Sequence, residues 1–134
     1  MQVFIVIHKV RVDLSKTKNI TLELDDTIAP KTVSSFLNCL PLDVKINIWG
    51  EELYTDKTQI DVGDENSKSI VDKMDVAFWP QGNAICLFFG PTPISSKGEI
   101  RPYSPVNVMG KIRKTETDFI KNIHDGTQVT FALE

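Results

Sequence analysis

Two adjacent carboxylates, Glu51 and Glu52, form a candidate pair for acid–base chemistry. They lie in a stretch with strand-like alternation, in which consecutive side chains point to opposite faces of a sheet. At most one of them can therefore enter a site, where it would lie near Tyr54, and we place Glu51 there. A carboxylate beside aromatic rings has a raised pKa and can act as a base or anchor a substrate amine. The alternative is that both are solvated surface acids.

Aromatic side chains near these carboxylates can form the flat apolar walls of a ligand groove. Trp49 precedes Gly50, and a glycine in a strand marks either a bulge or a close approach of a ligand. Phe88 and Phe89 are consecutive, so one of them must face the core, which is the commoner place for an aromatic residue on a strand. An aromatic groove and an ordinary core are both open interpretations. The candidate groove residues are Trp49, Tyr54, Trp79 and Phe89.

The segment from Gly90 to Pro105 holds four of the seven prolines and predicts a long irregular loop, of a length that often has a function. Prolines lack the N–H donors that cradle a phosphate, so we do not expect a nucleotide site here. We expect the loop to be stiff and to hold the rim of the groove. Arg101 and Tyr103 can present polar contacts across it, and Arg101 can bind a carboxylate bidentately. An exposed arginine without a ligand is the alternative for Arg101.

Metal-ligating residues are few and far apart in the chain. The two cysteines, Cys39 and Cys86, match neither a disulfide scaffold nor a metal site made of close pairs. Neither His8 nor His124 has another ligand at the spacing of a zinc site. We therefore predict no metal and no cofactor.

Length and charge restrict the class of protein. A chain of 134 residues is typical of one domain, and we expect residues 1–134 to form it. A net charge of −3 disfavours a nucleic-acid partner. No apolar stretch approaches the ~20 residues that span a bilayer, and the N-terminus lacks the layout of a signal peptide. We expect a cytoplasmic protein with no membrane partner, whose oligomeric state the sequence leaves open.

Most of the chain alternates between apolar and polar residues and predicts about eight short strands, without repeats or βαβ units. Such a pattern favours a barrel or a sandwich, and eight strands is the number whose interior side chains can fill a barrel completely. The stretches with this pattern are 1–12, 20–24, 44–49, 53–54, 60–62, 69–71, 76–78, 84–89, 106–112 and 129–133.

Two segments have helical spacing instead. Apolar residues three and four apart follow Pro30, which suits a first helical turn, and predict a short helix over 30–39. Thr115 resembles an N-cap and begins a second short helix, which ends before Gly126. The sequence therefore predicts a mainly β fold, a closed eight-stranded barrel capped by two short helices.

Three stretches of the sequence resemble the cyclophilins. Residues 20–36, ITLELDDTIAPKTVSSF, resemble the strand, acidic turn and P-K-T-x-x-x-F helix start of that family. Residues 87–89 resemble its Q-F-F strand, and residues 108–112 resemble its V-F-G-K-V strand. The segments WGEELY, DVAFWP and FFGPTP are similar to a bacterial and archaeal group of cyclophilin-like proteins of unassigned function. Met74 stands where that similarity leads us to expect glycine.

The resemblance implies an eight-stranded barrel with a helix at each end and a peptide-binding groove on one outer face, in which Phe89 aligns with a pocket phenylalanine. It also implies that the isomerase arginine is missing, because the matching strand reads KINIW at 45–49. The groove tryptophan and histidine of the family are replaced roughly by Arg101 and Val106. Lowering the ~18–20 kcal/mol barrier of proline isomerisation needs a fixed donor aimed at the changing charge.

Three functions remain as hypotheses. We favour a binding module that takes an extended peptide or a small molecule in an aromatic groove. The second is a prolyl isomerase that uses a relocated donor, and the third is a small hydrolase or amidase-related domain that uses Glu51 or Glu52.

Overall fold

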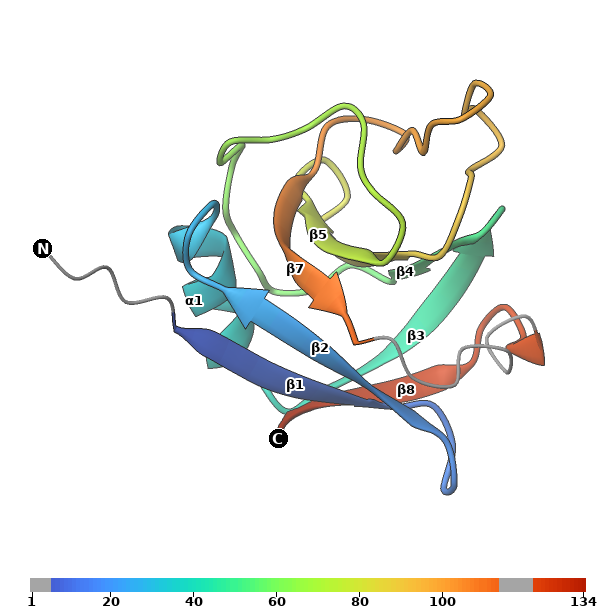
Figure 1. Ribbon diagram of the computed structural model, residues 1–134. Coiled ribbons are helices and arrows are strands. Elements are labelled where there is room, and N and C mark those ends of the chain that lie inside the picture. Colours follow the sequence, from blue (N-terminus) through green and yellow to red (C-terminus); the bar gives the residue numbers. More distant parts are fainter. Residues whose placement is uncertain (1–5, 114–121) are drawn as a thin grey trace, which may run out of the picture.

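Eight antiparallel strands close into a barrel in the computed structural model of the chain (Figure 1), which describes residues 6–113 and 122–134. Around the barrel the order is β1-β2-β7-β5-β6-β4-β3-β8. The predicted closed eight-stranded barrel is therefore confirmed. Its strands are β1 (Ile7–Asp13), β2 (Asn19–Asp25), β3 (Leu42–Trp49), β4 (Glu52–Thr55), β5 (Asp75–Trp79), β6 (Ala84–Phe88), β7 (Asn107–Ile112) and β8 (Gln128–Leu133).

One short helix, α1 (Pro30–Asn38), packs beside β2 and β7 and begins at the proline, as the spacing predicted. Most of the second predicted helix, from Thr115, lies outside the described residues. No described helix has the length and apolar character needed to cross a membrane.

The barrel interior holds the main hydrophobic core. Alternate residues of each strand point inward, and Val33 and Phe36 of α1 join them. The rings of Phe36 and Phe131 meet edge to face, with centroids 5.7 Å apart. The helix is thus held by aromatic packing against β8.

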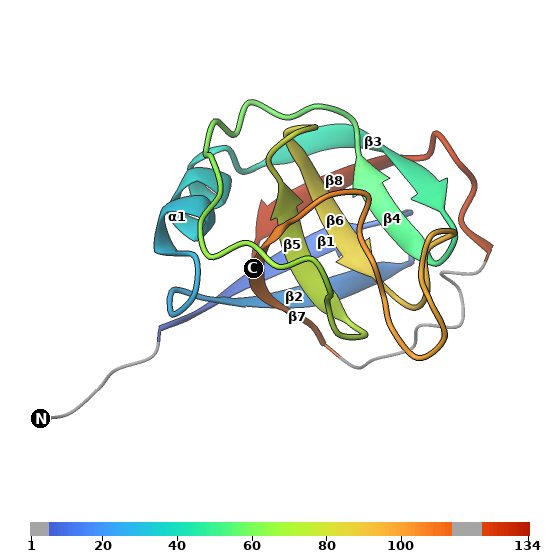
Figure 2. The ribbon, with the colours of Figure 1, turned by 90° about the horizontal axis from the view of Figure 1, so that it is seen from above.

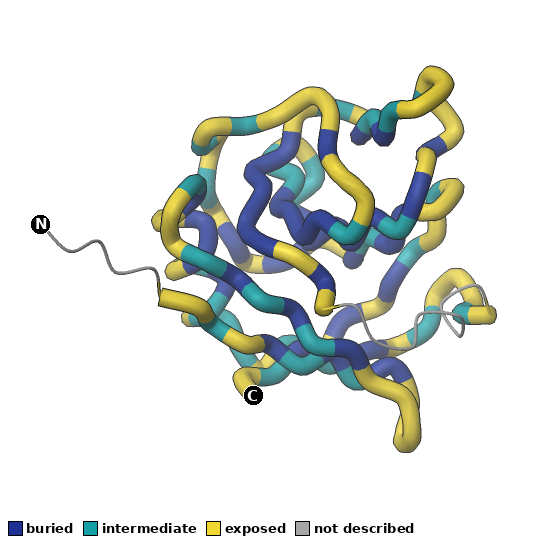
Figure 3. The backbone as a smooth tube through the Cα atoms, in the orientation of Figure 1, coloured by how far each residue is buried: buried dark blue, intermediate teal, exposed yellow. Residues whose placement is uncertain are grey.

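Two long connections, 56–74 and 89–106, cover the outer face of β5, β6 and β7. A second apolar cluster lies beneath them, in which Val71 and Ile100 from the connections pack on Cys86 and Phe88 of β6. Figure 2 shows the 89–106 connection, in orange, passing in front of β6 and β4. In Figure 3 many exposed residues lie in connections and hairpin tips, whereas β5, β6 and β7 are largely buried. Strands β5 and β6 are therefore buried on both faces.

The alternation at 60–62 and 69–71 does not produce strands, contrary to expectation. These residues belong to the 56–74 connection, which forms two isolated β-bridges, Lys68 with Val106 and Val71 with Ile100. The apolar residues Ile60 and Val71 are buried, so their pattern reflects packing rather than a β-ladder.

The 56–74 connection is pinned to α1 by Glu65. Its carboxylate accepts hydrogen bonds from the backbone N–H groups of Lys31 and Thr32, at 3.0 and 2.9 Å, and from the Thr32 hydroxyl at 2.7 Å. Partial burial alone would raise the pKa of Glu65, but the hydrogen bonds from Thr32 and Lys31 outweigh it and lower that pKa. Because Ala29 offers no side-chain acceptor, Glu65 supplies the missing cap from a distant part of the sequence.

Met74 adopts a left-handed backbone conformation with φ of +74°. Its N–H donates to the carbonyl of Phe88 and its carbonyl accepts from the N–H of Ile112, both at 2.7 Å. These two bonds join the start of β5 to β6 and β7 and hold the residue where glycine is the usual choice. The glycine that the family resemblance led us to expect at this position therefore has a backbone explanation.

We predict that Met74→Gly is about 1 kcal/mol more stable than Met74→Ala, because both variants lose the same side-chain packing and only glycine relieves the left-handed strain. Urea unfolding of the two variants measures the difference directly. An alanine variant as stable as the glycine variant would contradict the strain at this position.

Candidate functional site

A cavity of about 300 Å³ lies on the outer face of β4, β5 and β6. Tyr54 pairs with Cys86 across β4 and β6, and Cys86 pairs with Ala77 of β5, so this row of side chains forms the floor. The return of the 89–106 connection forms the opposite wall. We call this cavity the aromatic pocket, and its lining residues are Trp49, Glu52, Tyr54, Trp79, Cys86, Pro102, Tyr103 and Val106.

Four aromatic rings follow one another around the aromatic pocket. The ring centroids of Trp49 and Tyr103 are 6.1 Å apart, those of Tyr103 and Trp79 are 5.8 Å apart, and those of Trp79 and Tyr54 are 6.5 Å apart. Successive rings are inclined by 66°, 75° and 83°, which is the edge-to-face arrangement that aromatic pairs prefer. Four of the predicted site residues, Trp49, Tyr54, Trp79 and Tyr103, are thus brought together.

Trp79 is held rigidly within this set. Its indole N–H donates to the Ser104 hydroxyl at 2.5 Å, which ties β5 to the 89–106 connection. The far edge of the indole packs over Gly82, where a Cβ atom would lie 2.1 Å from the ring. The orientation of Trp79 therefore depends on a small residue beneath it and on one hydrogen bond at its edge.

Glu52 is the acidic residue of the aromatic pocket. It is only 5% exposed, and its Oε1 atom is buried without a hydrogen-bond partner among the described residues. Burial raises the pKa of Glu52 to about 7, although the Cys86 thiol acts to lower it. Near neutral pH this carboxyl group therefore exchanges readily between its neutral and charged forms.

Cys86 lies beside Glu52 and does not have the character of a reactive thiol. Complete burial, together with the charge of Glu52 and the hydrogen bond to it, raises the pKa of Cys86 well above its usual value. A protonated buried thiol is a poor nucleophile, so we assign Cys86 no chemistry.

Three predicted site residues lie elsewhere. Glu51 is exposed in the turn between β3 and β4, and its carboxylate packs against Gly90. Phe89 is partly buried and packs against the barrel core. Arg101 pairs with Glu99, Nε to Oε2 at 2.8 Å.

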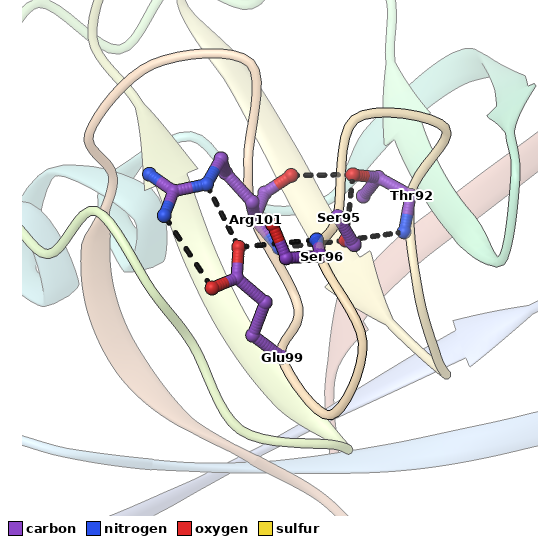
Figure 4. A network of polar contacts seen from close by, with 5 residues as sticks. All are labelled: Thr92, Ser95, Ser96, Glu99 and Arg101. Carbon is purple, nitrogen blue, oxygen red and sulfur yellow. Dashed lines mark hydrogen bonds and ion pairs between the residues drawn. The ribbon is translucent and has the colours of Figure 1, made fainter.

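Arg101 belongs to a network that shapes the 89–106 connection (Figure 4). The Ser95 hydroxyl accepts from the backbone N–H groups of Thr92 and Arg101, at 3.0 and 2.9 Å. The Thr92 hydroxyl donates to the Arg101 carbonyl at 2.5 Å. These bonds close the loop on itself, and the guanidinium is occupied by Glu99 rather than directed to a ligand.

Glu52, Cys86, Pro102 and Val106 line the aromatic pocket but were not among the predicted site residues. The two-residue repeat of a strand was the signal that identifies Glu52, since Glu52 lies two residues from Tyr54 and shares its face.

Gly50 has φ of +62°, and a Cβ there would lie 2.8 Å from Pro93. Glycine is therefore required at position 50 both by the left-handed backbone of the turn and by the close approach of the 89–106 connection.

The described residues contain no group of three or more His, Cys, Asp or Glu side chains that could hold a metal ion.

The pKa of Glu52 predicts an unusual dependence of stability on pH. Because the pKa is raised in the folded state, the native protein binds more protons than the unfolded chain between about pH 4.5 and 7. The free energy of unfolding should fall as pH rises through this window, by at most about 3 kcal/mol from this residue. Glu52→Gln should remove that fall and be more stable than the wild type at pH 8, as measured by urea unfolding at pH 5 and pH 8.

Glu51→Gln is the matched control, because Glu51 is adjacent and exposed. It should leave the pH profile unchanged. A Glu52→Gln variant that is less stable than the wild type at pH 8 would show that the carboxylate is stabilised in the fold.

Comparison with known proteins defines the relationship of the chain. A family model described as cyclophilin-like matches residues 8–132. The solution structure of the hypothetical protein AF2241 from Archaeoglobus fulgidus has 39% sequence identity, covers 100% of each chain and superposes with a TM-score of 0.80. No curated protein matches the chain. The family match across nearly the whole barrel shows that this chain belongs to the cyclophilin-like family.

Proposed function

We propose that this protein is a binding module that holds a small molecule, or one side chain of an extended peptide, in the aromatic pocket. The cavity volume of about 300 Å³ is at the lower end of the range for small-molecule sites. Its walls are mainly aromatic and carry a few polar groups that can orient a ligand, which is the usual composition of such sites.

The observation that carries this proposal is the unpartnered Oε1 atom of Glu52. A buried polar atom without a hydrogen bond costs about 1–3 kcal/mol, so native proteins contain few of them. A ligand in the aromatic pocket would supply the missing partner. The cost in the free protein would then be offset on binding.

The surrounding contacts favour a preformed pocket. The Ser95 network holds the 89–106 connection, and Ser104 fixes Trp79. A site whose walls are already ordered loses less conformational entropy when a ligand binds.

A thermal-shift screen with amines, amides, carboxylic acids and short peptides tests the proposal. A ligand at 100 times its dissociation constant should stabilise the protein by ~2.7 kcal/mol. Tyr103→Ala should weaken any hit about tenfold, because it removes one wall of the aromatic pocket. Tyr103 is 69% exposed, so its loss leaves the fold intact.

Ile94→Ala is the control for this screen, since Ile94 is an exposed apolar residue of the same connection and does not line the aromatic pocket. Its affinities should equal those of the wild type. Hits that Tyr103→Ala leaves unaffected would place the binding site elsewhere.

The proposal also predicts no acceleration of proline isomerisation. No arginine lines the aromatic pocket, and Asn47, in the strand where the family arginine was expected, donates to Asp56 at 2.9 Å. Among the described residues, the aromatic pocket therefore has no fixed cationic donor of the kind that the barrier requires. Turnover of a proline peptide that Tyr103→Ala or Arg101→Ala abolishes would contradict this prediction.

A further inference from the structure

We infer that the ligand of the aromatic pocket carries an alkylated ammonium group, which the four rings surround and which pairs with Glu52. This inference rests on the proposed function and names the chemical class of the ligand.

The rings form an angular enclosure rather than a stack. Successive members of the series Trp49, Tyr103, Trp79 and Tyr54 are steeply inclined to one another, so their faces are turned in different directions. The face of an aromatic ring carries partial negative charge and attracts cations, most strongly for tryptophan. Enclosures of this kind are the usual way in which proteins bind quaternary ammonium groups.

Formal charge around the aromatic pocket is negative. Glu52 is the ionisable acid among the lining residues, which include no lysine or arginine. Burial raises the pKa of Tyr54, and the charges of Asp125, Glu52 and Asp56 raise it further. Negative potential thus reaches the pocket from β4 and from the segment before β8. An anionic ligand would meet repulsion here, whereas a cation would be attracted.

The remaining walls favour alkyl substituents on the nitrogen. Pro102 and Val106 offer only apolar side-chain surface, and the indole N–H of Trp79 is already bonded to Ser104. A bare ammonium would need three hydrogen-bond acceptors, and the side chains of Pro102, Val106 and Trp79 supply none of them. Methyl or larger alkyl groups on the nitrogen make van der Waals contacts with this apolar surface, and the ammonium group keeps its positive charge.

The competing arrangement is a neutral Glu52 that donates a hydrogen bond to an amide or acid. The two arrangements have opposite pH dependence, because a cation needs the carboxylate and an amide acceptor needs the protonated acid. The other ionisable side chains that line the aromatic pocket are Tyr54, Cys86 and Tyr103. The pKa values of Tyr54 and Cys86 are raised, so neither group becomes charged between pH 5.5 and 8.

Calorimetric titration with choline and its neutral isostere 3,3-dimethylbutan-1-ol tests the inference, because the two differ in charge and hardly in shape. At pH 8 the wild type should bind choline at least about tenfold more tightly than the alcohol. Choline affinity should fall as pH decreases from 8 to 5.5 and Glu52 takes up its proton. The affinity for the alcohol should not fall.

Glu52→Gln should lower choline affinity at least about tenfold at pH 8, abolish its pH dependence and leave the alcohol unaffected. Glu51→Gln, the matched control, should behave as the wild type. A peptide carrying trimethyl-lysine, titrated in parallel, distinguishes the two sources of the ammonium group. Tighter binding of the peptide assigns the ammonium group to a protein side chain, and tighter binding of choline assigns it to a free small molecule.

Equal affinity for choline and the alcohol would overturn the inference and leave the binding module standing, as would an affinity for choline that rises toward pH 5.5. Absence of binding by both choline and the trimethyl-lysine peptide would also overturn it. The proposed function fails separately, if the thermal-shift screen finds no ligand whose binding depends on Tyr103.

Discussion

Strands β5 and β6 are buried on both faces, and the rest of the structure depends on this packing constraint. The inner residues of β4, β5 and β6 belong to the barrel core, and their outer residues must also be covered. The 56–74 and 89–106 connections provide that cover, and where they do not close completely the aromatic pocket remains. The pocket therefore follows from covering a sheet with loops, and the chemistry of its floor is set by the outward residues of β4 and β6.

Those loops are ordered by polar groups rather than by regular secondary structure. The side-chain amide of fully buried Asn107 donates to the Thr32 hydroxyl and the Gly63 carbonyl. Its side-chain oxygen, Oδ1, accepts from the backbone N–H of Glu65. Together with the Ser95 network, these bonds satisfy backbone groups that a strand would have satisfied by its ladder. The wall that the 89–106 connection forms is thus ordered by the Ser95 network, while Oε1 of Glu52 in the pocket has no hydrogen-bond partner among the described residues.

Local patterns predicted most of the fold. Period-two alternation predicted most of the strands and the Pro30 signal predicted α1, and the left-handed backbone at position 74 explains why glycine was expected where Met74 stands. The spacing of two residues between Glu52 and Tyr54 was the signal that favoured Glu52 over Glu51, and the hairpin register agrees with it, because Trp49 pairs with Glu52 and Glu51 lies in the turn. The pairing of Arg101 with Glu99 could not be predicted from the sequence, because the hydrogen bonds of the folded loop decide its conformation.

The proposed function depends on Glu52, a buried carboxyl group whose Oε1 atom has no hydrogen-bond partner among the described residues. NMR titration of this carboxyl group, in the free protein and with saturating choline, tests its proposed role. We expect a pKa of about 7 in the free protein and a clear decrease with choline, because the cation stabilises the carboxylate. A pKa near 4.5 in the free protein, or a pKa that choline does not lower, would contradict it.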